Sequence, residues 1–264
     1  MTFLQMLITA IVQGVTEFLP ISSSGHLILT PVFLGAEDQG PLIDVAVHVG
    51  SLLAIIVYFF RDAWGLVRGG FSTVGIGEAP DQRRLFWWIV IGTIPAVAFG
   101  FFLQSQGYLD SFRSTDLVAV NLIAYGILLG LADRFGRQEK VYEDMSLRDA
   151  IVVGLAQALA LIPGTSRSGV TMTAARFLGY KRVEAARFSF LLSIPAVAGA
   201  GVLIVPEIME VGGELVTEAL ITGTLTFFAA LATMHFLMRF LRKASMMIFV
   251  VYRVLLGIVL LWMF

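Results

Sequence analysis

The polar stretch QGVTEFLPISSSGH at residues 13–26 decides the fold of this chain, because it interrupts the apolar region 1–34 in its middle. A second interruption, PGTSRSG at residues 163–169, breaks the apolar region 149–180 in the same way. Proline and glycine are the residues least easily accommodated inside a helix. Neither apolar region is therefore predicted to be one continuous helix.

Composition identifies the surroundings of these segments. Of the 264 residues, 58% are hydrophobic and 14% are charged, and the mean hydropathy of +0.86 is far outside the usage of soluble domains. The net charge of -1 gives no reason to expect nucleic acid as a partner. The absence of cysteine excludes disulfides, thiolate metal sites and cysteine nucleophiles. The sequence therefore predicts an all-α polytopic membrane protein.

Six further stretches are apolar and long enough to span a membrane, for which about 20 residues are needed. They are 41–60, 85–103, 117–132, 188–204, 219–238 and 245–263. The two interrupted regions are predicted to be re-entrant helix pairs, each meeting at a polar turn. Non-helical backbone at membrane depth is tolerated only where protein or a wet cavity satisfies its amides. Each pair should return to the side on which it begins.

Charge in the loops predicts the topology. Arginine and lysine gather in the loops 61–84, 133–149 and 239–243, which the positive-inside rule places in the cytoplasm. The loop 104–116 has one arginine and the loop 205–218 has four glutamates, so both are predicted to face outside. Under this topology the two re-entrant pairs enter the membrane from opposite sides and are inverted.

A weak internal repeat agrees with the inverted arrangement. A shift of 144 residues aligns Gln13 with Gln157, Ser22 with Ser166, Ser24 with Ser168, and Gly25 with Gly169. Inverted repeats commonly meet at a site near the membrane midplane. We therefore predict a single membrane domain over residues 1–264, with one repeat at about 1–132 and the other at about 149–264.

Gln13 and Glu17 are four residues apart on a predicted helix and share one of its faces. A charge in mid-bilayer costs about 2.5 to 3.5 kcal/mol on insertion scales, so Glu17 should face a partner, water or a cation. Carboxylate and amide oxygens suit Mg²⁺ or Ca²⁺. We therefore expect a divalent cation as cofactor, with Glu17 and Gln13 as its ligands. A polar pair that only packs helices together is the alternative.

The first turn concentrates three hydroxyls, a glycine and an imidazole in five residues: Ser22, Ser23, Ser24, Gly25 and His26. The glycine permits the sharp backbone that aims amides inward. A serine-rich helix cap explains the hydroxyls alone. It does not explain His26 together with Glu17, because base, hydroxyl and carboxylate are the parts of an activated nucleophile. The pattern favours chemistry.

Arg167 places a permanently charged fork in the second turn, beside a predicted helix N-terminus, a combination that binds phosphate. Its neighbours add hydroxyl and glycine positions: Thr165, Ser166, Ser168 and Gly169. The alternative is a salt bridge to Glu17 with no ligand, but a lone ion pair does not need these neighbours. Asp44 and His48 share a face near the outer end of a predicted span and are candidates for the mouth of the same cavity.

These residues resemble the motifs of the undecaprenyl-diphosphatase family of bacterial inner membranes, the bacitracin-resistance type. Residues 13–20 fit its (Glu/Gln)xxxGlu motif, and SSSGH at 22–26 follows as in that family. Its second signature, Pro-Gly-x-Ser-Arg-Ser-Gly, is similar to residues 163–169, and the similarity extends through 188–192 to the C-terminal helices. Gln13 takes the amide option of the first motif, which weakens any mechanism that needs two carboxylates there.

The resemblance implies hydrolysis of undecaprenyl diphosphate to undecaprenyl phosphate and inorganic phosphate. This reaction recycles the carrier lipid for peptidoglycan and other cell-wall polymers, and bacitracin resistance follows because the drug binds the diphosphate form. The resemblance also implies a multi-pass protein of the bacterial inner (plasma) membrane, with a divalent cation, Mg²⁺ or Ca²⁺, and a site facing the periplasm or exterior. Partners would be the lipid diphosphate and membrane lipids, with a homodimer as a candidate assembly.

Roles follow from the resemblance for residues that match its motifs. Glu17 and Gln13 would handle the metal or proton transfer, Ser23 would be the favoured nucleophile, and His26 the acid or base, with Arg167 also catalytic. A phosphohistidine at His26 and attack by a metal-bound water stay open. The substrate-binding residues would be Gln13, Ser22, Ser24, Thr165, Ser166, Ser168 and Gly169.

Other functions fit parts of the pattern. A transporter or flippase for a lipid phosphate or another anion would use inverted re-entrant repeats but needs no nucleophile. A Ser/His intramembrane protease would have no use for Arg167. The phosphatidic-acid phosphatase family shares Ser-Gly-His and Ser-Arg elements, but it requires a histidine where this chain has Thr173, and its upstream Lys/Arg signature is missing.

Overall fold

The computed structural model describes residues 1–35, 39–107, 114–211 and 213–263, and the predicted all-α class is confirmed for them. The helices are α1 (Phe3–Thr16), α2 (Ser23–Leu34), α3 (Gly40–Tyr58), α4 (Phe60–Thr73), α5 (Pro80–Ser105), α6 (Thr115–Phe135), α7 (Leu147–Leu159), α8 (Arg167–Phe177), α9 (Arg182–Val211), α10 (Gly213–Leu241) and α11 (Met247–Met263), with a short 3-10 helix, η2 (Tyr142–Asp144), before α7. Both interrupted regions are broken where the sequence predicts: α1 and α2 flank the first turn, and α7 and α8 flank the second.

The surface of this bundle is apolar and its interior contains charge. Phe101 and Trp262 are 74% and 86% exposed, whereas the guanidinium side chains of Arg176 and Arg253 are fully buried. Charged residues within a membrane almost always face the interior of the bundle, where protein groups can pair with them. The distribution is that of a protein surrounded by lipid.

Three helices, α5, α6 and residues 215–241 of α10, are long and apolar enough to cross a membrane. α3 and α4 meet at a 90° bend and together count as a fourth span by the same criterion. α11 is apolar but shorter than the other spans. The six predicted spans therefore stay a prediction, since length and composition of the described residues support only these.

Two predicted loops are helical instead. α4 lies in the loop 61–84, where Arg61 and Arg68 project outward while Gly69 meets the backbone of Gln82, so that α4 packs on α5. A Cβ at Gly69 would lie 2.2 Å from the Gln82 carbonyl oxygen, which explains the glycine. The loop 205–218 is taken up by the end of α9 and the start of α10. Within the loop 104–116, α5 ends at Ser105 and α6 begins at Thr115, and residues 108–113 lie outside the described residues.

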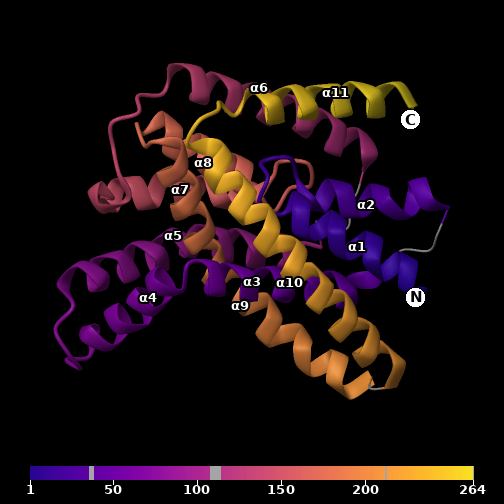
Figure 1. The fold of residues 1–264 in the computed structure, drawn as a ribbon, viewed down its shortest axis with the longest axis horizontal. Helices are drawn as coiled ribbons and strands as arrows, with labels where there is room; N and C mark the ends of the chain where they lie inside the picture. The colour runs from indigo at the N-terminus through magenta and orange to yellow at the C-terminus, as the bar shows by residue number, and fades with distance from the viewer. Residues whose placement is uncertain (36–38, 108–113, 212, 264) are drawn as a thin grey trace.

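Helices from both halves of the chain pack against the two broken pairs (Figure 1). α6 and α11 lie side by side along one edge, and α9 and α10 extend together at the opposite edge. α1 packs against α10, and α7 packs against α5, so each pair is held by a helix from the other half of the chain. The connections between α1 and α2 and between α7 and α8 approach each other in the middle of the molecule.

Candidate active site

The first turn begins where α1 ends. Glu17 still has helical backbone angles and donates its N–H to the carbonyl of Gln13 at 3.0 Å. Five residues later Ser22 has φ = 76°, and α2 begins at Ser23. The Ser22 Oγ accepts the N–H of Gly25 at 3.4 Å, which satisfies one of the free donors at the start of α2.

The second turn uses the same device. Ser166 has φ = 71°, and its Oγ accepts the N–H of Gly169 at 3.1 Å, capping α8. Among the described residues, Ser22 and Ser166 are the non-glycine residues with positive φ. Such a backbone costs about 1 to 3 kcal/mol and is found mostly at functional sites, where the surroundings impose it. The predicted alignment of these two serines therefore corresponds to a shared local structure.

The carboxylate of Glu17 joins the two turns. Its Oε1 pairs with the guanidinium of Arg167, and its Oε2 accepts from the Ser23 hydroxyl at 2.6 Å and from the Gln13 amide at 3.1 Å. The Nε2 of His48, on α3, lies 3.6 Å from the same Oε2. Glu17 is only 5% exposed, so its charge is compensated by these neighbours rather than by solvent. The structure thus brings Glu17, Ser23 and Arg167 together.

A cavity of ≈ 420 Å³ lies at this junction. Its polar lining comes from both turns and from α3 and α7: Glu17, Ser23, Ser24, Asp44, His48, Gln157, Ser166 and Arg167. Its apolar lining consists of short aliphatic side chains and one leucine: Val45, Ala96, Ala160, Leu161, Ala196 and Val197. Asp44 and His48, the candidates for the mouth of the cavity, are among the residues that line it. One basic group, several hydroxyls and small apolar walls suit a phosphate group carried by a lipid.

Five of the predicted binding residues lie behind the cavity wall rather than on it. Gln13 and Ser22 are buried beside Glu17 and in the first turn. Ser168 donates its hydroxyl to the Leu19 carbonyl at 3.1 Å and so ties the second turn to the first. Thr165 and Gly169 are placed within the second turn, against Arg253. These residues shape the turns.

His26 is not brought to the cavity, which corrects its predicted position among the reacting groups. Its Nδ1 donates to the Ser22 carbonyl at 2.7 Å, and its Nε2 lies 2.6 Å from the hydroxyl of Tyr252 on α11. The two rings stack at 5.7 Å with an interplanar angle of 11°. Its two ring nitrogens contact the first turn and α11, so the imidazole links the first turn to α11.

Arg253 was missed by the sequence reasoning. Its fully buried guanidinium donates to carbonyl oxygens of α6 and of both turns: Leu122 at 3.2 Å, Asn121 at 3.3 Å, Pro20 at 3.2 Å, Gly164 at 3.0 Å and Thr165 at 2.9 Å. Broken helices leave carbonyls unpaired, and in lipid these must be satisfied by protein. The available signal was a cation in the middle of the apolar stretch 245–263.

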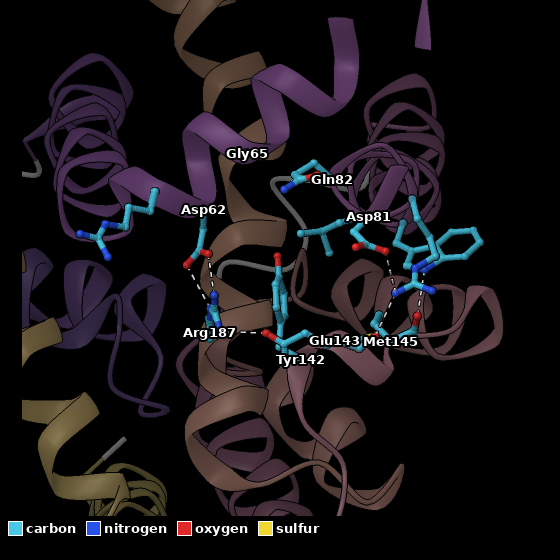
Figure 2. A pocket seen from close by; sticks show the side chains of 12 residues that line it. Asp62, Gly65, Asp81, Gln82, Tyr142, Glu143, Met145 and Arg187 are labelled. Carbon is cyan, nitrogen blue, oxygen red and sulfur yellow. Dashed lines mark hydrogen bonds and ion pairs between the residues drawn. The ribbon is translucent and has the colours of Figure 1, made fainter. Parts of the chain in front are cut away.

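A second polar pocket, of ≈ 310 Å³, lies between α4, α5, η2 and α9 (Figure 2). Here Arg187 forms a two-pronged ion pair with Asp62, at 2.6 and 3.0 Å, and its guanidinium lies 4.4 Å from the ring centre of Tyr142. Burial and the Asp62 carboxylate raise the pKa of the Tyr142 hydroxyl, which is therefore neutral at physiological pH. Asp62, Tyr142 and Arg187 thus connect α4, η2 and α9, and the charges of Asp62 and Arg187 pair with each other.

Comparison with known protein families covers the segments that form the cavity. The family model described as Bacitracin resistance protein BacA matches residues 6–259. The chain belongs to this family. The match includes both turns, and every residue that lines the cavity lies within the matched residues 6–259.

Relatives of this family are similar over the whole chain. A protein of Erythrobacter litoralis named undecaprenyl-diphosphatase is 65% identical, with 100% of both chains covered. Proteins of the same name from Jannaschia sp. and Hahella chejuensis are 47% and 46% identical; 99% and 100% of this chain and 98% and 99% of theirs are covered.

Proposed function

We propose that this protein hydrolyses undecaprenyl diphosphate to undecaprenyl phosphate and inorganic phosphate. The observation that carries the proposal is the meeting of Ser23, Glu17 and Arg167 at one cavity between two turns. The names of the relatives agree with it. A transporter of lipid phosphate would need the guanidinium, but it would not need a hydroxyl that donates directly to a carboxylate.

Ser23 is the nucleophile in this proposal. Its Oγ attacks the terminal phosphorus while Glu17, at 2.6 Å, takes the hydroxyl proton. The bond from that phosphorus to the bridging oxygen breaks, and undecaprenyl phosphate leaves. Water then hydrolyses the phosphoserine and releases inorganic phosphate. The Nε2 of His48 lies 3.6 Å from the Glu17 Oε2, whereas the Nε2 of His26 contacts Tyr252.

Arg167 supplies positive charge to the phosphoryl oxygens. Phosphoryl transfer requires alignment of the attacking oxygen and neutralisation of the charge on the three equatorial oxygens. Arg167 pairs with Glu17, so a bound diphosphate would compete with the carboxylate for the guanidinium. That exchange would free Glu17 to accept the Ser23 proton.

The side-chain oxygens of Glu17 and Gln13 suit a divalent cation, Mg²⁺ or Ca²⁺. The side-chain nitrogen of Gln13 donates to Glu17. Its Oε1 is buried and has no hydrogen-bond partner among the described residues, so this oxygen is free to bind a cation. Groups of three or more acidic or histidine ligands are absent from the part of the chain that the structure describes. Mg²⁺ is commonly held by one or two protein oxygens together with substrate phosphates. Glu17 and Gln13 would hold the ion, which would neutralise phosphate charge.

The membrane setting follows from the substrate. A long isoprenoid tail stays in the bilayer, since each buried methylene contributes about 0.8 kcal/mol, so the polar groups must come to the lipid. We place the protein in the bacterial inner membrane with the cavity open to the periplasm. The proposed topology has six spans and two inverted re-entrant pairs, with repeats at about 1–132 and 149–264, and a homodimer as the candidate assembly. The packing of α1 on α10 and of α7 on α5 supports the proposed inverted repeats, because each re-entrant pair contacts a helix of the other repeat.

Phosphate release by purified protein in detergent tests the proposal. With undecaprenyl diphosphate and Mg²⁺ or Ca²⁺ present, we expect inorganic phosphate and undecaprenyl phosphate in equal amounts. Transport cannot occur in detergent, so a protein that binds the lipid without releasing phosphate would be a transporter. Addition of a chelator should abolish release, and activity that persists in excess chelator would contradict the cation assignment.

A further inference from the structure

Gln157, on α7, is a buried amide on the wall of the cavity. It is 2% exposed, and neither its Oε1 nor its Nε2 has a hydrogen-bond partner among the described residues. A buried amide without partners costs free energy, because it loses its bonds to water and gains none from the protein. Such a group at the edge of a binding cavity indicates a ligand that completes its hydrogen bonds.

Comparison with the other half of the chain explains why this amide is unpaired. Gln13 aligns with Gln157, and in the first half its Nε2 donates to Glu17, four residues later, at 3.1 Å. The residue four positions after Gln157 is Leu161, which offers no acceptor. The same helix position therefore has a partner within the protein in one half and lacks one in the other.

The neighbours of Gln157 indicate what the ligand carries. The cavity that it lines also contains Arg167, Ser23, Ser24 and Ser166, which are donors suited to phosphate oxygens. A neutral amide adds a further donor without adding charge. We propose that Gln157 binds the head group of the lipid diphosphate, with its Nε2 donating to a phosphate oxygen. This inference rests on the proposed function and adds a residue to its binding site.

The substitution Gln157→Met tests the inference because it keeps the length of the side chain and removes both polar atoms. We expect KM for undecaprenyl diphosphate to rise about 10- to 100-fold, as for the loss of one hydrogen bond to a charged group, with a smaller change in kcat. The isosteric Gln157→Glu should raise KM further, because its charge repels phosphate. Gln104→Met, at an exposed position of α5, is the control and should match the wild type.

Thermal unfolding separates ligand binding from a structural role. In the protein without ligand, Gln157→Met should leave the melting temperature unchanged or higher, because it removes an unpaired buried amide. Farnesyl methylenediphosphonate, a lipid diphosphate that cannot be hydrolysed, should raise the melting temperature of the wild type but much less that of the variant. A lower melting temperature with an unchanged KM would assign Gln157 to packing and overturn the inference.

The outcomes also separate this inference from the proposed function. A wild-type protein that releases no phosphate would refute the phosphatase, yet the shift in melting temperature with the diphosphonate would still test Gln157. If the wild type is active and both variants keep its KM and its ligand-induced shift, the Gln157 inference alone fails.

Discussion

The two turns that meet at the cavity share a local backbone conformation but carry side chains of opposite charge. In each, a serine with φ near +70° accepts the N–H of a glycine three residues later, with Ser22 at 76° and Ser166 at 71°. Each serine Oγ also lies close to the hydroxyl two residues on, at 3.4 Å in the first turn and 3.3 Å in the second. A repeated local structure thus builds both sides of the site.

The side chains at equivalent positions differ where chemistry is needed. Ser23 in the first turn corresponds to Arg167 in the second, and Glu17 corresponds to Leu161. The first turn therefore supplies the hydroxyl and the negative charge, while the second supplies the positive charge. The two turns can divide the tasks of phosphoryl transfer because the packing of the chain brings them together at one cavity.

The largest effect is expected for the nucleophile. Ser23→Ala should reduce phosphate release by more than about 1,000-fold, since it removes the attacking oxygen of the proposed mechanism. The rate of phosphate release from undecaprenyl diphosphate measures this. Ser51→Ala, which removes a buried hydroxyl bonded to the Val47 carbonyl outside the cavity, is the control. Substantial activity in Ser23→Ala would point to attack by water or by an imidazole.

Glu17→Gln removes the negative charge of the first turn and keeps its shape. We expect a loss in kcat of about 100- to 10,000-fold, because an amide cannot take the Ser23 proton. Glu218→Gln, a carboxylate paired with the chain's amino terminus, is the control and should retain the wild-type kcat. The division of tasks between the turns is wrong if both variants lose activity equally.

Arg167→Lys tests the positive side. It keeps the charge but loses the planar fork, so we expect kcat/KM to fall about 10- to 100-fold. The matched change Arg187→Lys breaks the two-pronged pair with Asp62 in the second pocket, and it should affect thermal stability rather than kcat/KM (Figure 2). Equal losses of kcat/KM in both variants would mean that Arg167 acts through folding.

The smallest effects concern the shared backbone. Ser22→Ala and Ser166→Ala should each lower the free energy of unfolding by about 1 to 2 kcal/mol, because alanine loses the cap and keeps the strain of a positive φ. The matching glycine variants should cost only a few tenths of a kcal/mol, since glycine tolerates that backbone. Chemical unfolding in detergent measures these values. Unequal costs at the two positions would show that the turns are not equivalent.

The sequence by itself determined the helical class, the two breaks and the groups carried by each turn. Lipid requires every backbone group to be satisfied within the protein, so apolar length and interrupting Pro, Gly and Ser residues predict local structure well. A carboxylate such as Glu17 or a guanidinium such as Arg167 stands out in apolar surroundings, because burial of a charge is costly without a function or a partner.

Only the tertiary structure decided which groups face the cavity. His26 turns to Tyr252 on α11, Gln157 is left without the acceptor that Gln13 has, and Arg253 gathers carbonyls from α6 and both turns. α4 likewise forms within the predicted cytoplasmic loop 61–84, because its small residues allow close packing on α5. These outcomes depend on contacts between segments far apart in the chain, whose distances and orientations no local pattern encodes.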